Sequence, residues 1–179
     1  MIRVLIVCSV IFFGQATTAD AQSLVKLRCE YLEEPIGVDA QAPRFTWQIN
    51  DTSRGARQTG FTVKVATDPV FRDMVGQMNS NSANAGSQLV QYAGMKLQPF
   101  TKYYWTVEAR NTAGKRLQSK VASFETGLMG MHNWKGSWIS DVSDVDFKPA
   151  GQFRKAFNVS KKIRSARAYI AVAGLYELY

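Results

Sequence analysis

The side chains in this sequence that could do chemistry are few and scattered. Its densest acidic group is Asp141, Asp144 and Asp146, in the stretch SDVSDVDF. Three carboxylates in one loop could hold calcium through their oxygens. The spacing lacks the glycine and the closing glutamate of an EF-hand loop. We therefore interpret the three acids as a solvated loop between domains, and the sequence predicts neither a metal site nor a cofactor.

Nucleophilic chemistry would need a cysteine or serine beside a general base. The chain holds two cysteines, Cys8 and Cys29, and a single histidine, His132. Cys29 lies in the alternating stretch LVKLRCEYL, far in sequence from His132. We therefore interpret Cys29 as a small buried hydrophobic residue. No phosphate-binding glycine loop, zinc spacing or Ser/His/Asp arrangement occurs, so the sequence predicts no catalytic residue.

Aromatic side chains are the remaining candidates, because an exposed ring can stack on a sugar. Tyr104 lies on the outer face of a predicted strand, and Trp134 and Trp138 flank the letters KGS. The alternative for Tyr104 is a structural place in a sheet. The alternative for the two tryptophans is that they pin a linker between two domains. All three are sugar-stacking candidates.

The first residues predict export. Arg3 precedes an apolar run from Val4 to Phe13, and a polar tail ends in Ala19-Asp20-Ala21. This pattern is typical of a cleaved signal peptide over residues 1–21, and the run is too short to span a bilayer. The mature chain would be secreted or periplasmic, with Cys29 as its only cysteine and no internal disulfide.

The net charge of +8 does not by itself indicate a nucleic-acid partner. The lysines and arginines are scattered, and the densest group, KKIRSAR at 161–167, interleaves them with small and apolar residues. Such interleaving is typical of a solvated strand edge. We expect no nucleic-acid partner and no membrane span, and the sequence leaves the oligomeric state open.

The elements that must position these side chains are strands. Apolar and polar residues alternate with period two in short runs, separated by clusters of Gly, Pro, Asn and Asp. This pattern predicts an all-β protein with an immunoglobulin/fibronectin type III-like antiparallel sandwich over residues 22–130. In the run YYWTVEARN we expect Tyr103 and Trp105 to be buried, with the Tyr103 hydroxyl bonded to upstream backbone as a tyrosine corner.

Two further expectations concern the edges of this sandwich. The stretch Met74–Gln88 is rich in Asn, Ser and Gly, which predicts a long surface loop. The first strand is expected to point these residues to one face: Val25, Leu27, Cys29 and Tyr31.

Residues 131–179 read as a linker and the truncated start of a second domain. The stretches QFRKAFNV and SARAYIAVAGLYELY predict strands that find no partners in the chain. So few residues cannot form an independent sandwich. We therefore expect an incomplete second β-sandwich.

The spacing L-x-P-x-T-x-Y-x-x-x-V-x-A-x-N-x-x-G resembles the signature of fibronectin type III domains. The order of LRCEYLEEPIGVDAQAPRFTWQI, YYWTVEARNTAGK, WKGSWIS, QFRKAFNV and ARAYIAVAGLYELY resembles the bacterial α-L-rhamnosidase family of glycoside hydrolases. That resemblance implies a fibronectin-like sandwich, a second sandwich and then a catalytic α/α-barrel. The acid and the carboxylate of inverting hydrolysis would lie in the barrel, which this chain lacks.

The resemblance thus implies a non-catalytic N-terminal fragment of a secreted enzyme that removes terminal rhamnose from glycans. Its glycan substrate would be reached through the missing catalytic domain. The alternative is a secreted interaction module that binds polysaccharide or protein at the cell surface. In either case we expect Asn133–Tyr179 to be protease-sensitive and Leu24–Gly127 to resist.

Overall fold

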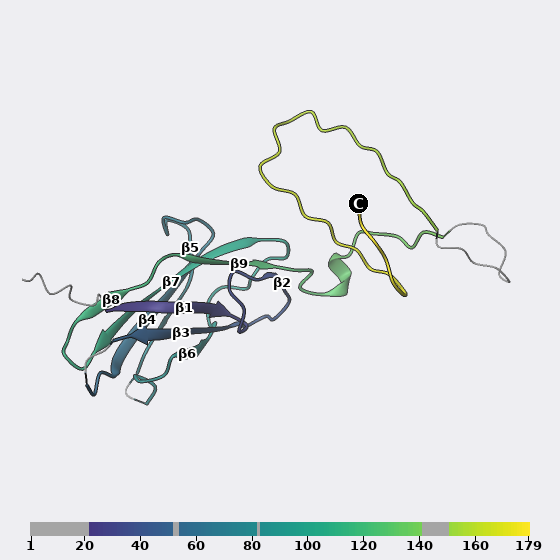
Figure 1. The fold of residues 1–179 in the computed structure, drawn as a ribbon. Coiled ribbons are helices and arrows are strands. Elements are labelled where there is room, and N and C mark those ends of the chain that lie inside the picture. Colours follow the sequence, from purple (N-terminus) through teal and green to yellow (C-terminus); the bar gives the residue numbers. More distant parts are fainter. Residues whose placement is uncertain (1–21, 52–53, 82, 141–150) are drawn as a thin grey trace, which may run out of the picture. The chain divides into compact units, whose positions relative to one another are not determined.

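The structure, a computed structural model, describes residues 22–51, 54–81, 83–140 and 151–179 (Figure 1). The chain divides into two units between Lys135 and Gly136, and each is described by itself. The predicted signal peptide and the acids Asp141, Asp144 and Asp146 lie outside the described residues. Within the described ranges, no helix is long and apolar enough to cross a membrane.

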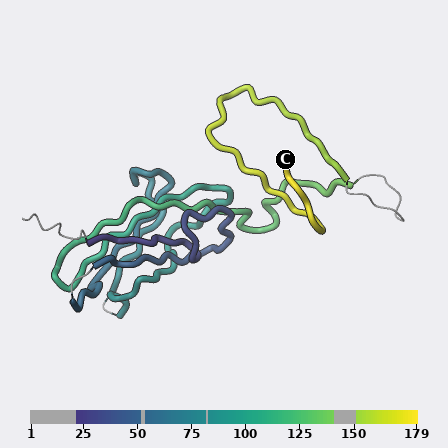
Figure 2. The backbone as a smooth tube through the Cα atoms, viewed as in Figure 1, coloured from purple at the N-terminus to yellow at the C-terminus, as the bar shows by residue number. Residues whose placement is uncertain are grey.

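The first unit is built from two sheets (Figures 1 and 2). The three-stranded sheet contains, in order, β1 (Ser23–Cys29), β3 (Arg44–Asn50) and β6 (Leu89–Gln91). The larger sheet contains, in order, β2 (Ile36–Val38), β9 (Ala122–Thr126), β7 (Lys102–Asn111), β4 (Gln58–Ala66) and β5 (Met74–Asn79), with β8 (Arg116–Gln118) paired to β7. The strand pairs are antiparallel, except that β2 runs parallel to β9. The all-β prediction is confirmed.

Aromatic residues from the two sheets meet in the core. Phe45 of β3 packs on Trp105 of β7, with ring centroids 4.6 Å apart. Alternation along β7 buries Tyr103 and Trp105, which are 2% and 1% exposed, as predicted. The Tyr103 hydroxyl accepts a hydrogen bond from the Gln98 amide at 2.8 Å. The predicted tyrosine corner is therefore present, and it ties the start of β7 to the segment before it.

The predicted facing of the first strand is wrong at both of its ends. Leu24 and Cys29 are both buried, although they are five positions apart and would lie on opposite faces of a regular strand. Tyr31, in the turn after β1, is 52% exposed. The pairing of β1 with β3 shifts register between Val25 and Arg28, and Lys26 has φ 50°. An extra residue at such a bulge swaps the face that later side chains occupy.

The prediction of a loop across Met74–Gln88 is wrong for its first part. Residues Met74–Asn79 form β5, which pairs with β4 and buries Met78. The sequence analysis also did not foresee the short strands β2 and β8. All three lie at the periphery of the sheet, where a neighbouring strand supplies backbone hydrogen bonds that local composition does not reveal.

In the second unit, the described residues 136–140 and 151–179 are exposed and form no strand. The strands predicted in QFRKAFNV and SARAYIAVAGLYELY are therefore not formed in this structure. A strand exists only where a neighbour accepts and donates its backbone hydrogen bonds. The alternating side chains of this segment, Phe153 and Leu175 among them, remain exposed.

Candidate functional site

The sugar-stacking candidate Tyr104 lies in β7, on the opposite face from Tyr103 and Trp105. It is half-buried, opposite Ser123 of β9 and Ala66 of β4. The Lys102 ammonium lies 5.5 Å from the centroid of its ring. An incoming sugar would have to share this ring with that cation, so sugar stacking on Tyr104 stays a prediction.

The two tryptophan candidates fall in different units. Trp134 is half-buried and follows the short 3-10 turn Met131–Asn133, where its amide donates to the Met131 carbonyl at 3.0 Å. Trp138 belongs to the second unit and is 77% exposed. A role in sugar stacking stays a prediction for both rings.

Cys29 is a core residue rather than a nucleophile. Its side chain is 1% exposed and not disulfide-bonded. Burial, with a smaller effect of the Glu30 charge, raises the pKa of the Cys29 thiol to about 12. Because the thiolate is the reactive form, this thiol is inert in the folded protein. His132 is exposed, in the turn that follows the sandwich.

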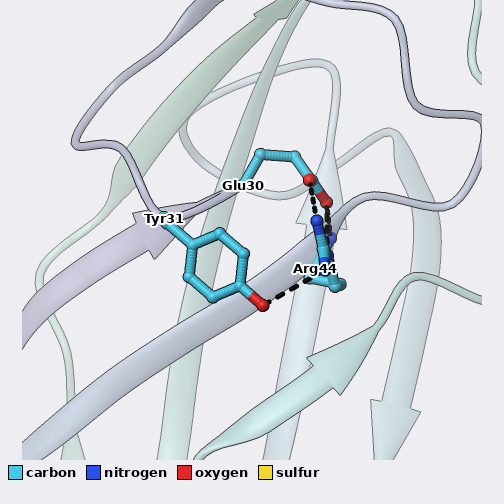
Figure 3. Close-up of polar contacts among 3 residues, drawn as sticks. All are labelled: Glu30, Tyr31 and Arg44. Atoms are coloured by element: carbon cyan, nitrogen blue, oxygen red, sulfur yellow. Dashed lines mark hydrogen bonds and ion pairs between the residues drawn. The ribbon is translucent and has the colours of Figure 1, made fainter.

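The strongest polar cluster is one that the sequence analysis missed. Arg44, at the start of β3, donates from Nε to Oε1 of Glu30 at 3.2 Å and from Nη2 to Oε2 at 2.7 Å (Figure 3). The Arg44 backbone amide also donates to Oε1 at 2.6 Å. Its Nη1 donates to the Tyr31 hydroxyl at 3.1 Å, and its guanidinium lies 4.7 Å from the Tyr31 ring centroid.

These contacts hold a turn that the residue types disfavour. Cys29 and Leu32 exchange two backbone hydrogen bonds of 2.9 and 3.0 Å around Glu30 and Tyr31. Both central residues have positive φ, 48° and 65°, as a type I′ hairpin turn requires. Asn and Gly suit such positions, whereas other residues pay about 1 kcal/mol each. The bidentate Arg44 contacts offset part of this cost.

The hydrogen bonds of this cluster argue against a role for Glu30 as a general acid. The Arg44 side-chain hydrogen bonds lower the pKa of Glu30, because they favour its charged form. Glycoside hydrolysis needs a general acid whose pKa is raised, which is the opposite shift. The Glu30–Arg44 pair is therefore a structural clamp. Finding it from sequence would have required the register that sets Cys29 opposite Phe45.

Other carboxylates in the described residues also serve the backbone. Asp68 accepts hydrogen bonds from the amides of Val70, Arg72 and Asp73 at 2.8 to 2.9 Å, and these bonds lower its pKa. In the part of the chain that the structure describes, no group of three or more His, Cys, Asp and Glu residues could hold a metal ion.

Two sheets, a tyrosine corner and polar groups committed to turns define the class of protein: an immunoglobulin-like β-sandwich module. The family model for the Rha78A-like N-terminal immunoglobulin domain matches residues 24–130, and the chain belongs to this family.

Curated relatives carry the same module. The chain is 35% identical over 123 residues to an α-L-rhamnosidase of Streptomyces avermitilis, a match that covers 68% of this chain and 12% of that protein. It is 27% identical over 171 residues to an α-L-rhamnosidase of Formosa agariphila, covering 81% of this chain and 18% of that protein. The chain thus spans less than a fifth of the length of these relatives.

Solved structures of α-L-rhamnosidases also resemble this chain. The α-L-rhamnosidase from Dictyoglumus thermophilum matches with a TM-score of 0.58 and 30% identity, over 66% of this chain and 14% of that chain. The Streptomyces avermitilis enzyme complexed with L-rhamnose matches with a TM-score of 0.59 and 33% identity, over 67% of this chain and 12% of that chain. The resemblance to the N-terminal part of an α-L-rhamnosidase is confirmed.

Proposed function

We propose that this chain is the non-catalytic N-terminal part of an exported α-L-rhamnosidase that removes terminal rhamnose from glycans. The observation that carries the proposal is the family match over residues 24–130, shared with relatives named as α-L-rhamnosidases that extend far beyond the matched region. Hydrolysis belongs to the part of those relatives that this chain does not span. The module supports that part, and the glycan substrate is bound there.

The hydrogen bonds that Glu30 and Asp68 accept support a non-catalytic role for this module. Glu30 is bound by Arg44, and the carboxylate of Asp68 accepts three backbone amides. Neither is free to protonate a leaving oxygen or to activate a water. The signal-like pattern over residues 1–21 supports export, and amino-terminal sequencing of the exported chain should then begin near Gln22.

A chimera tests the support role. Residues 24–135 of this chain would replace the aligned region of the Streptomyces avermitilis relative, and a deletion of that region would serve as control. We expect the chimera to hydrolyse an aryl α-L-rhamnoside, and the deletion to be less stable. Rhamnose release by this chain alone, well above buffer, would show that the module is itself catalytic and would refute the proposal.

The alternative, an interaction module, is separated by direct binding. The isolated chain would be run on affinity gels that contain rhamnose-bearing polysaccharide, beside the variants Tyr104→Ala, Trp134→Ala and Trp138→Ala. Under the support role the chain migrates as in a gel without polysaccharide. Retardation that one of these variants abolishes would establish glycan binding and identify the stacking ring.

A further inference from the structure

The chain does not leave the sandwich where its last strand ends. Beyond β9, the Gly127 amide donates to the Val38 carbonyl at 3.0 Å, and the Gly127 carbonyl accepts from the Phe100 amide at 3.0 Å. The segment therefore remains bonded on both sides, to β2 and to the approach of β7. We call residues 127–134 the exit strap (Figure 1).

Asp39 holds the centre of the exit strap. Its Oδ1 accepts a hydrogen bond from the Met129 amide at 2.7 Å. The same oxygen lies 2.7 Å from where a Cβ on Gly127 would stand, so the carboxylate is seated against the strap backbone. On the other side of Met129, its carbonyl accepts from Gln41 Nε2 at 3.5 Å.

The backbone conformation of Met129 shows that its surroundings fix the path of the exit strap. Its φ of 54° is rare for a residue with a side chain, yet its side chain is 8% exposed and packs in the core cluster. Such a conformation persists only where the surroundings fix it. Here Asp39 and Gln41 bind the two polar groups of the Met129 backbone, and the core holds its side chain.

The rest of the strap closes on itself. Gly130, at φ 133°, turns the chain, and Asn133 Nδ2 donates to the Leu128 carbonyl at 2.8 Å. The Trp134 amide then donates to the Met131 carbonyl at 3.0 Å. These hydrogen bonds extend the ordered backbone from the sandwich to Trp134, one residue short of the last residue of the first unit, Lys135.

We propose that the exit strap is a built connector, and that Asp39 is the positioning residue that fixes its course. The hydrogen-bonded backbone of the first unit then continues past the end of β9 as far as Trp134. The inference stands without the proposed function, since it concerns only how the chain leaves this module.

Hydrogen exchange of the full chain tests whether Asp39 fixes the course of the exit strap. Asp39→Ala removes the acceptor, and we expect the Met129 amide to exchange at least about tenfold faster. Asp39→Asn keeps an acceptor oxygen and should restore most of the protection. The control Glu33→Ala removes an exposed carboxylate that is 3.6 Å from Arg28, and it should leave Met129 unchanged.

A double-mutant cycle with Gly127→Ala distinguishes a local effect of Asp39 on the exit strap from a general loss of stability. Gly127→Ala places its Cβ against Asp39 Oδ1 at 2.7 Å and Cγ at 3.2 Å, so by itself it should also expose the Met129 amide. In the Asp39→Ala background those two atoms are gone and only the Gly37 backbone carbon, at 3.2 Å, stays close, so Gly127→Ala should add less exchange there than it does alone.

Three results would overturn the proposal. One is an unchanged Met129 amide in Asp39→Ala. Another is equal acceleration across β4 and β7, because Asp39 would then stabilise the whole fold rather than the strap. The third is full additivity of Gly127→Ala and Asp39→Ala, because the two residues would then act independently.

Discussion

Two buried tryptophans of the sandwich differ in one property, which makes them a matched pair. Trp47 and Trp105 are 2% and 1% exposed. Trp47 Nε1 donates to Gln58 Oε1 at 2.9 Å, whereas Trp105 Nε1 is buried with no hydrogen-bond partner among the described residues. The Gln58 amide nitrogen donates to the carbonyls of Ala85 and Ser87, which fixes its oxygen toward Trp47.

Replacing each tryptophan by phenylalanine removes the same atoms from the core, so that shared loss largely cancels in a comparison. Trp47→Phe also loses a hydrogen bond and leaves the buried Gln58 oxygen unpaired, which costs about 1–3 kcal/mol. Trp105→Phe removes an unpaired donor, which returns about 1–3 kcal/mol. The free energy of unfolding should therefore fall by about 2–6 kcal/mol more in Trp47→Phe than in Trp105→Phe.

Thermal unfolding followed by far-ultraviolet circular dichroism measures this difference. At about 4 °C per kcal/mol for a domain of this size, the melting temperature of Trp47→Phe should lie at least about 8 °C below that of Trp105→Phe. Urea titration gives the same comparison as a free energy. If Trp105→Phe proved as costly as Trp47→Phe, hydrogen-bond satisfaction would not distinguish the two sites, and the reasoning would be refuted.

Three further predictions follow from the same structure. The Cys29 thiol, with its pKa raised to about 12 by burial, should resist an aromatic disulfide reagent in the folded chain and react once the chain is unfolded; reaction in native conditions would contradict its burial. Because Arg44 lowers the pKa of Glu30, the stability from this pair is present above the ordinary carboxyl pKa of 4.5 and is lost as pH falls through the lowered one. The stability gap between wild type and Glu30→Gln should therefore shrink from pH 7 toward about pH 3, and a gap independent of pH would contradict the clamp. Limited proteolysis of the monomeric chain should cut Gly136–Tyr179 before residues 24–127, since the described residues of the second unit are exposed and lack strand hydrogen bonds; equal cutting of both would contradict this.

The central strand shows how far sequence reasoning reached. Alternation in YYWTVEARN predicted the buried face of β7 and the tyrosine corner, because a long strand between two neighbours buries one face along its whole length. The sequence reasoning failed at β5, where Met74–Asn79 mixes apolar residues with Gly, Gln and Asn and shows no regular alternation. An edge strand takes its hydrogen bonds from one neighbour and needs little apolar surface, so its own residues carry a weak signal.

The candidate residues divide in the same way. Cys29 was correctly predicted as a buried hydrophobic residue, since the alternation of apolar and polar residues that precedes it is local in sequence. The Glu30–Arg44 clamp was missed because its two residues are 14 positions apart and meet only through the register of β1 with β3. Tyr31 was placed in the core because the alternation was continued past Cys29, where the strand ends and the chain turns through the positive φ of Glu30 and Tyr31.

The sequence by itself determined that the chain is β-rich and which family its module resembles, because two-residue periodicity and turn residues are properties of neighbouring positions. The tertiary structure alone decided which polar groups meet: Glu30 with Arg44, Trp47 with Gln58, and Asp39 with Met129. Each of these pairs joins segments distant in the chain. Its geometry is set by strand register and by the packing of one sheet on the other, which no local pattern encodes.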